Sequence, residues 1–145
     1  MNTDNRPLPK PDEDSEEFWR YCNEHQLRMQ GCQDCGTIRF RPSVICPKCL
    51  SSDFTWQLLS GSGQIHSFVI VHQAMVPGYS EVPYVLALVE LDEGPRMTTR
   101  IVNCDISEVS IGSRVQVCFE DATDTVSLPV FTPSKDQFLK YLHEE

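Results

Sequence analysis

The 145-residue sequence contains no long run of apolar residues and comparatively few basic ones. A membrane-spanning helix needs about 20 mainly apolar residues, so none is expected. The first residues, MNTDNRPLPKPDEDSEE, lack the apolar stretch of a secretory signal. We therefore expect a cytoplasmic protein that does not bind membranes, in a compartment where disulfides rarely persist.

Basic side chains are scarcest in the second half of the chain. The 12 basic and 21 acidic residues give a formal net charge of −9, and residues 58–134 contain three arginines, no lysine and nine acidic residues. A surface of this sign repels the phosphate backbone that dominates nucleic-acid binding. There is also no Gly-rich phosphate loop of the P-loop or dinucleotide type. The composition therefore does not favour a nucleic-acid-binding protein.

The most specific pattern is formed by four of the seven cysteines. Cys32, Cys35, Cys46 and Cys49 follow the spacing C-x2-C-x10-C-x2-C. Each C-x-x-C pair presents two thiolates from one tight turn, and two facing turns form the tetrahedral site of a structural zinc ribbon. Gly36 follows the first pair, where such a turn commonly needs a positive φ. Four cysteine ligands leave no open coordination position, so the site is expected to stabilise the fold and not to catalyse a reaction.

Other uses of these cysteines remain open at this point. Two disulfides would use the same four residues, although the expected compartment disfavours them. Iron is the main rival to zinc, because a tetrathiolate site suits both metals. A catalytic redox pair would need only one C-x-x-C within a βαβ pattern, and no such pattern surrounds it. The remaining three are expected to be free thiols that behave as small apolar groups: Cys22, Cys104 and Cys118.

The N-terminal part divides into a tail and a helix that leads into the ribbon. Residues 1–14 are polar, acidic and Pro-rich, which predicts a mobile tail. Ser15 is placed to cap a helix that runs to about His25. This helix and the zinc ribbon together occupy residues 15–57. The ribbon has little apolar content, so the metal is expected to contribute much of its stability.

From residue 58 onward the pattern is that of β-strands. Short apolar or alternating segments follow one another, separated by turn residues and without a helical period. Five short strands suit a small Greek-key barrel of the OB-fold type over residues 58–134. A last helix is predicted over residues 135–145, with Ser134 as its cap. The expected fold is mainly β with short terminal helices, and the predicted strands are 64–73, 83–91, 96–102, 114–120 and 125–131.

Several short segments match the pattern of a known family in their order and spacing. They are residues 18–19, 27–36, 40, 42, 46–49, 56, 61–63, 67–72, 83–85, 89–94, 111–112, 115 and 129–131. Together they resemble the DUF35 family, also called OB-fold acyl-CoA-associated zinc-finger proteins. Leu50 departs from the pattern, because the family often has Gly after the second cysteine pair. Arg41 and Ser43 also interrupt a usual Phe-Pro-Pro-Arg stretch.

The resemblance implies an N-terminal helix, a rubredoxin-like zinc ribbon and a C-terminal OB-fold. Family members are similar in serving as small subunits of thiolase-superfamily enzymes that carry out acyl-CoA condensation, retro-aldol side-chain cleavage or acyl transfer. The resemblance thus implies a non-catalytic accessory subunit with one structural Zn2+. Its partner would be a thiolase-like or lipid-transfer-type enzyme in a hetero-oligomer, where this chain helps to shape the CoA channel. Two alternatives remain, a single-stranded nucleic-acid module and a stand-alone acyl-CoA-binding protein.

No residue carries the local signature of a catalytic group. His66 and His72 are expected on one face of one strand, about 20 Å apart, which is too far to share a metal or a proton. No Ser, Cys or Lys has the surroundings of an activated nucleophile. The expected catalytic set is therefore empty, and the remaining candidates are binding residues.

Three groups of residues are candidates for contacts with a partner or with a CoA ester. Phe18 and Trp19 either pack against the chain's own ribbon or barrel, or dock onto a partner. The loop after the first barrel strand carries apolar side chains, and OB-folds use this loop in binding. The barrel arginines either bind CoA phosphates or pair with the surplus carboxylates. The loop and arginine candidates are Met75, Val76, Tyr79, Arg96, Arg100 and Arg114.

Overall fold

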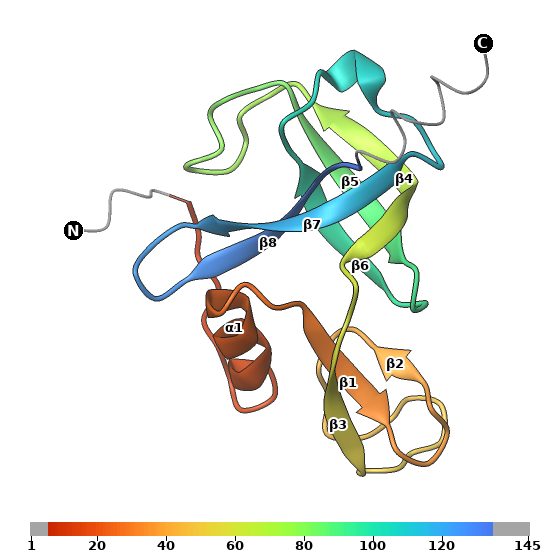
Figure 1. Cartoon of the computed structure of the whole chain (residues 1–145). Coiled ribbons are helices and arrows are strands. Elements are labelled where there is room, and N and C mark those ends of the chain that lie inside the picture. Colours follow the sequence, from red (N-terminus) through yellow and green to blue (C-terminus); the bar gives the residue numbers. More distant parts are fainter. Residues whose placement is uncertain (1–5, 135–145) are drawn as a thin grey trace.

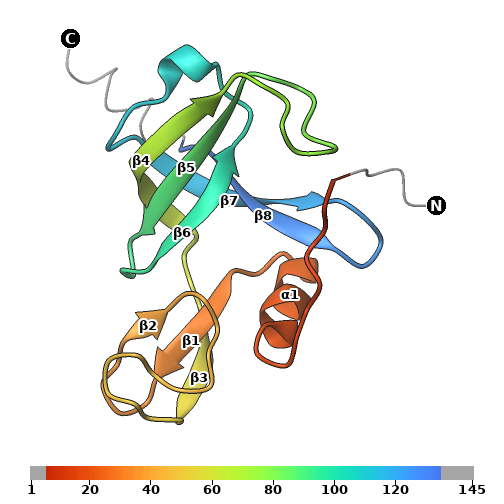
Figure 2. The ribbon, with the colours of Figure 1, turned by 180° about the vertical axis from the view of Figure 1, so that it is seen from behind.

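The computed structural model describes residues 6–134, which form a small β-ribbon and a barrel arranged end to end (Figures 1 and 2). In the ribbon, β1 (Arg28–Cys32) pairs antiparallel with β2 (Ile38–Arg39) and with β3 (Phe54–Leu58). Helix α1 (Glu16–Asn23) lies beside the ribbon, below the end of the barrel. No helix in the described part of the chain is long and apolar enough to cross a membrane.

The barrel is closed by five strands in the order β4-β5-β6-β8-β7. This is the strand order of an OB-fold, so the predicted fold class is confirmed. Every predicted strand is present, with bounds that differ by at most two residues. A short 3-10 helix that the sequence did not predict, η1 (Ile106–Glu108), lies between β6 and β7. The strands are β4 (Ser62–Val71), β5 (Tyr84–Leu91), β6 (Arg96–Ile101), β7 (Arg114–Asp121) and β8 (Ser127–Pro133).

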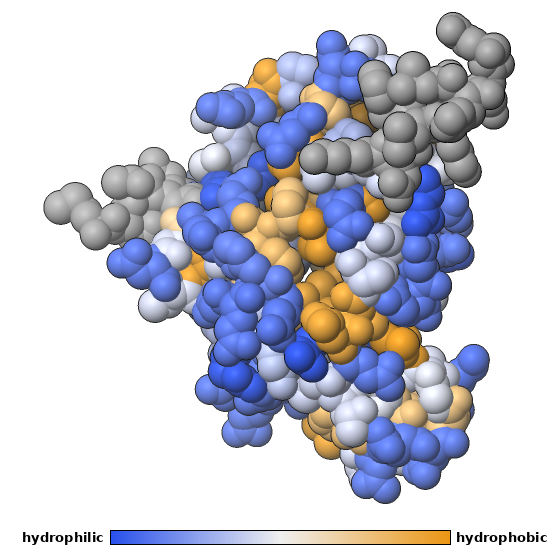
Figure 3. Space-filling view, viewed as in Figure 1, coloured by the Kyte–Doolittle hydropathy of each residue, from blue (hydrophilic) through white to orange (hydrophobic). Residues whose placement is uncertain are grey.

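The core lies inside the barrel because alternate residues of each strand point inward. In β5 the alternation is complete, and the inward residues Val85, Ala87, Val89 and Leu91 are all buried. Phe131 of β8 fills the interior and has no exposed surface. Apolar side chains also gather on the outside, over the connection from β3 to β4 (Figure 3).

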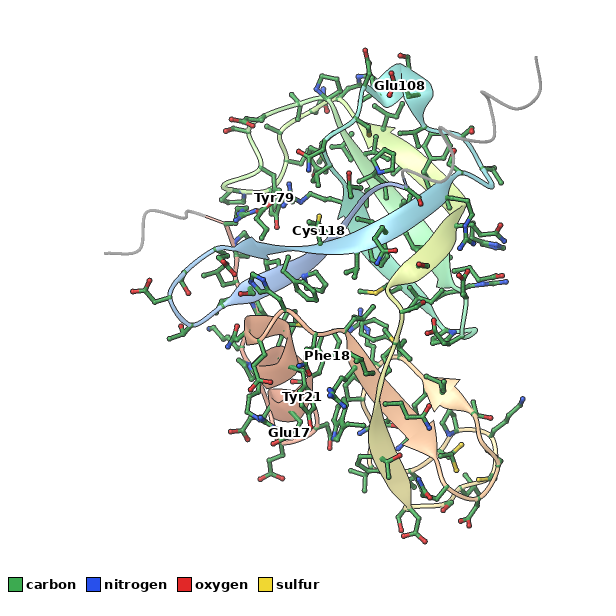
Figure 4. The ribbon with its side chains drawn as sticks, in the orientation of Figure 1. Glu17, Phe18, Tyr21, Tyr79, Glu108 and Cys118 are labelled. Atoms are coloured by element: carbon green, nitrogen blue, oxygen red, sulfur yellow. The ribbon has the colours of Figure 1, made fainter. Side chains whose placement is uncertain are left out.

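Helix α1 joins the ribbon to the barrel. Figure 4 shows Phe18 and Tyr21 directed from the helix toward the ribbon, where their rings lie 5.5 Å from Phe40 and 5.9 Å from Trp56. At the other end of the helix, the Asn23 amide donates to a carbonyl of the β7–β8 turn at 2.7 Å. The helix is therefore held by both modules.

The ends of α1 differ from the prediction in two details. Ser15 occupies the cap position, but its hydroxyl bonds to the Asp12 carboxylate at 2.8 Å and makes no side-chain cap hydrogen bond to the helix. The helix ends at Asn23, two residues earlier than expected. His25 adopts a φ of 58°, stacks on Phe119 at 5.2 Å and places Nε2 2.7 Å from an Asp121 carboxylate oxygen.

The segment before α1, expected as part of a mobile tail, lies against the barrel from residue 6 onward. Arg6 forms an ion pair with Glu120, and its guanidinium carbon lies 5.7 Å from the centre of the Tyr79 ring. The backbone of Arg6 also passes so close to Gly78 that a Cβ atom at this position would clash with it. The predicted C-terminal helix over residues 135–145 lies outside the described residues.

Candidate metal centre

Two matching turns bring the four cysteines together. In the first turn the Gly36 amide donates to the Cys32 carbonyl at 3.0 Å, and in the second the Leu50 amide donates to the Cys46 carbonyl at 2.9 Å. The residue after each pair has a positive φ, 76° at Gly36 and 67° at Leu50. The prediction for Gly36 is confirmed, and Leu50 adopts the same backbone conformation despite its Cβ.

The geometry of the sulfur atoms fits a tetrahedral metal ion. All four Sγ atoms lie within 4.8 Å of one another. The Cys32–Cys49 distance is 3.5 Å and the Cys35–Cys46 distance is 3.7 Å. Zn–S bonds of about 2.3 Å in a tetrahedron place sulfurs about 3.8 Å apart. These residues therefore fit a structural zinc ion held by four thiolates, with no position left for a substrate.

The surroundings of the thiols shift their pKa values in opposite directions, even within the cluster, where the Ser51 amide lowers the pKa of Cys49 but a hydrogen bond to Cys32 and burial raise it to about 12. The Thr37 hydroxyl lies 3.2 Å from Cys35 Sγ, and this hydrogen bond lowers the pKa of Cys35 to about 6, which favours the thiolate form. In contrast, burial raises the pKa of Cys22 to about 12. Cys22 therefore packs as a neutral apolar group, in agreement with the prediction from the sequence.

Replacing Leu50 with glycine is expected to stabilise the ribbon. A side chain at positive φ costs roughly 1–2 kcal/mol, and the greater freedom of glycine in the unfolded chain offsets roughly 0.5–1 kcal/mol of this. The Leu50 side chain is 72% exposed, so little burial is lost. We expect Leu50→Gly to raise the free energy of unfolding of the metal-loaded protein by about 0.5–1 kcal/mol, measured by urea denaturation. Gly36→Leu is the matched opposite change, and equal stability of both variants would contradict this account.

The three barrel arginines are paired with carboxylates on neighbouring elements. Arg96 Nε donates to Glu90 at 2.9 Å. Arg100 Nη2 contacts both carboxylate oxygens of Glu120, at 2.9 and 3.0 Å, and Arg114 forms two bonds to Asp92, at 2.8 and 2.7 Å. The expected salt bridges are therefore present in the chain, and contacts of these arginines with a CoA ester stay a prediction. A CoA phosphate at any of them would compete with a carboxylate that is already in place.

The Arg114–Asp92 pair predicts a small pH dependence of stability. The hydrogen bond from Arg114 lowers the pKa of Asp92 below its ordinary value of 3.8. A carboxylate with a lowered folded-state pKa contributes stability above the unfolded value, and that contribution is lost as the pH falls through the folded value. The pair is largely exposed, so at most about 1 kcal/mol is expected.

This dependence is measured against the neutral variant Asp92→Asn. Urea denaturation at pH 7 should show the wild type to be more stable than Asp92→Asn, and the difference should disappear as the pH falls below about 4. Because both proteins carry the same cysteines, acid release of metal affects them equally. A difference that does not shrink as the pH falls through this range would show that Asp92 acts through its shape and not through its charge.

The candidate contact residues lie in different environments. Met75 is 81% exposed and Val76 is 41% exposed, so both lie on the surface of the β4–β5 loop. Tyr79 is half-buried near the base of that loop, and Arg100 approaches its ring centre to 5.3 Å. Phe18 is only 2% exposed and belongs to the chain's own core, whereas its neighbour Trp19 is half-buried.

A cleft of about 250 Å³ lies where α1, the ribbon and the barrel meet. Trp19, Phe40 and Tyr79 line it together with outward side chains of β5, β6 and β8. Its walls are mainly apolar, and Arg100 is the charged group among them. The strands β5 and β6 form the face that OB-folds commonly use for binding, but here the N-terminal part of the chain covers part of it.

His66 and His72 are placed apart from the cysteine centre in the described part of the chain. The prediction that His66 and His72 share one face of one strand is wrong, because β4 ends at Val71 and its register shifts between Ile65 and Ser67. Both histidines are exposed. The cysteine centre is the only cluster of metal-binding side chains found within residues 6–134.

Sequence reasoning missed two buried polar residues that hold the ribbon loop after β2. The amide of Ser43 donates to Gln30 Oε1 at 2.9 Å, and the Ser43 carbonyl accepts from Arg39 Nη2 at 2.9 Å. Gln30 and Arg39 are 2% and 5% exposed. In the sequence, Gln30 and Arg39 are only polar residues within two short β-segments. Nothing in that pattern indicates that both would bind Ser43, which lies 13 residues from Gln30 and 4 residues from Arg39.

Comparisons with known proteins agree with this geometry. The ChsH2 rubredoxin-like zinc ribbon domain matches residues 19–55, and the ChsH2 C-terminal OB-fold domain matches residues 56–120. Among solved structures, a chain of an Ltp2-ChsH2(DUF35) aldolase aligns with a TM-score of 0.80 and 34% identity. The alignment covers 86% of this chain and 98% of that chain.

Two relatives show how much of each protein the similarity covers. A DUF35 domain-containing scaffold protein of Methanocaldococcus jannaschii is 38% identical over 114 residues, which cover 74% of this chain and 81% of the relative. A probable enoyl-CoA hydratase alpha subunit of Thermomonospora curvata is 35% identical over 132 residues, or 91% of this chain. The present chain spans only 41% of the length of that second relative.

Proposed function

Because this chain belongs to the DUF35 family and carries its zinc ribbon and OB-fold domains, we propose that it is a non-catalytic accessory subunit of an acyl-CoA enzyme of the thiolase superfamily. The partner reaction would be a condensation, a retro-aldol cleavage or an acyl transfer in lipid or steroid metabolism. The observation that carries this proposal is the similarity to scaffold proteins and to the ChsH2 chain of an aldolase, over nearly the whole of that chain.

The chemistry of the described residues supports an accessory role. The metal centre is closed by four sulfurs, so it offers no open position for a substrate. The exposed histidines lie apart from it and form no cluster with other metal-binding side chains in residues 6–134. A subunit of this kind contributes surfaces to an assembly, while the reaction takes place on the partner.

The nucleic-acid alternative is not favoured by the charges of the barrel. Single-strand binding by an OB-fold needs a basic path beside aromatic platforms. Each of the three barrel arginines is instead paired with a carboxylate, as described above. A salt-sensitive shift of single-stranded RNA by the pure protein would reopen this alternative.

Co-expression with the acyl-CoA enzyme encoded beside this chain tests the proposal directly. We expect the tagged chain to purify with the thiolase-type subunit as a hetero-oligomer, identified by mass spectrometry and by its mass in light scattering. Turnover of an acyl-CoA should require the partner. If the chain purifies alone, or if it converts an acyl-CoA without the partner, the proposal is wrong.

Within this complex we propose that the β4–β5 loop contacts the partner near its CoA channel. Met75 and Val76 provide the exposed apolar surface, and Tyr79 with Trp19 borders the cleft beneath the loop. Arg6 and Arg100 both contact Glu120 at this corner of the barrel. An anionic group of a CoA ester would compete with Glu120 for these guanidinium groups.

A further inference from the structure

Three apolar side chains at or beside the second cysteine turn are exposed and contribute little to the core of the chain. Val44 is 63% exposed, Ile45 is 49% exposed and Leu50 is 72% exposed. The Cys46 carbonyl accepts from the Leu50 amide, and Ile45 directly precedes Cys46, so Ile45 and Leu50 flank the same turn. We refer to residues 41–50 as the ribbon tip. Its cysteine turn, residues 45–50, lies at the end of the ribbon away from the barrel and its β4–β5 loop (Figure 1).

The backbone that presents these side chains is held in place by buried polar groups. Gln30 and Arg39 bind the amide and the carbonyl of Ser43, and the Ser43 hydroxyl donates to the Ile45 carbonyl at 2.8 Å. Val44 lies between two residues that are fixed in this way. A loop ordered in advance loses little entropy on binding, so it is suited to contact with a partner.

The backbone conformation of Leu50 also favours a contact with a partner. Its position favours glycine, because the backbone has a φ of 67°. The side chain gains nothing in return within the chain, since 72% of its surface is exposed. Burial of the Leu50 side chain in a complex would explain why a large apolar residue occupies a strained and exposed position.

The exposed charged side chains of the ribbon tip are all basic, unlike those of the barrel. No acidic residue lies between Asp34 and Asp53, while Arg41 and Lys48 are exposed beside the apolar side chains. A zinc ion with four thiolates has a net charge of −2, and Arg41 and Lys48 together carry +2, so the tip as a whole is neutral while its exposed side-chain charges are positive. The barrel has a surplus of acidic residues and would repel a carboxylate-rich surface that the tip attracts.

We infer that the ribbon tip is a second docking surface, which receives an apolar groove bordered by carboxylates on the thiolase-type partner. The inference rests on the proposed function for the identity of the partner. The ribbon tip would be a contact site distinct from the β4–β5 loop, and the metal centre would then contribute to assembly of the complex. The zinc ion would fix the turn that presents Ile45 and Leu50 to the partner.

The test uses variants with opposite effects on folding and on binding. Leu50→Gly removes the apolar side chain but relieves the backbone, so it should raise the resistance of the chain to urea while weakening binding to the co-expressed partner by at least about tenfold. Leu50→Ala should weaken binding similarly. Ile111→Ala is the matched control, because Ile111 is 71% exposed and belongs to the connection from η1 to β7, which lies at the end of the barrel away from the ribbon (Figure 1). It should leave binding unchanged.

Charge is tested separately with Lys48→Glu. Wild-type association, followed by surface plasmon resonance between 50 and 300 mM NaCl, should slow as salt screens the basic groups. Lys48→Glu should associate more slowly than the wild type at low salt and should show much less dependence on salt. Zinc content measured for every variant confirms that the turn itself is intact.

The outcomes separate the inference from the proposed function. If the wild type binds the partner and Leu50→Ala binds equally well, the ribbon tip is not a docking surface, while the accessory function stands. If the wild type has no such partner, both ideas are wrong. A homodimer of the isolated chain that Leu50→Ala dissociates, seen by light scattering, would assign the tip to a second copy of this chain and would also overturn the inference.

Discussion

Replacing Cys35 with serine is expected to abolish metal binding and to unfold the ribbon. Structural zinc contributes roughly 10–16 kcal/mol to small peptide sites near neutral pH, which far exceeds what the thin apolar content of this ribbon supplies. Three remaining thiols leave the tetrahedron open, and the two turns lose the ion that joins them. Elemental analysis should show at least one zinc ion per wild-type chain and none in Cys35→Ser.

The same variant should unfold the ribbon and leave the barrel folded. Most residues of the buried core lie on the barrel strands, so the near-ultraviolet signal of the ribbon residue Trp56 should be lost while the far-ultraviolet β signal of the barrel persists. The complex with the partner should be lost as well, because both the ribbon tip and the packing of α1 depend on the ribbon. Cys118→Ser is the control, since Cys118 lies on β7 and not in the cysteine cluster. A metal-free, fully assembled Cys35→Ser protein would refute this role.

Replacing Phe18 with alanine is expected to have the second largest effect. Phe18 is 2% exposed and its ring lies 5.1 Å from Trp19 and 5.5 Å from Phe40, at the junction of helix, ribbon and barrel. Removing a buried phenylalanine typically costs about 3–5 kcal/mol, from lost burial and from the cavity that remains. We expect a loss of this size in the free energy of unfolding, measured by urea denaturation of the zinc-loaded protein.

The neighbouring variant Trp19→Ala distinguishes stability from association. Trp19 is only half-buried and borders the cleft near Tyr79, so its removal should cost less stability than Phe18→Ala. If Trp19 contacts the partner, Trp19→Ala should weaken the complex more than its stability loss explains. A loss below about 1 kcal/mol for Phe18→Ala would show that the junction does not depend on this ring.

The metal centre and the strands could be predicted because their signals are local. Cys32 and Cys35 are close in the chain, as are Cys46 and Cys49, and a tight turn is enough to orient each pair. The alternation in β5 and the turn at Asp92–Gly94 likewise depend on neighbouring residues. The error at His72 came from extending an alternation past the end of a strand and across a bulge that the sequence does not mark.

The sequence by itself determined that four cysteines make a closed metal site and that five strands follow it, because spacing along the chain fixes local geometry. Only the tertiary structure decided which side chains stabilise the fold and which remain exposed for contact with a partner. Arg100 meets Glu120 across 20 residues and Arg6 reaches the same carboxylate across 114. Closure of the barrel creates such pairs, and it also decides that Phe18 is buried while Leu50 stays on the surface.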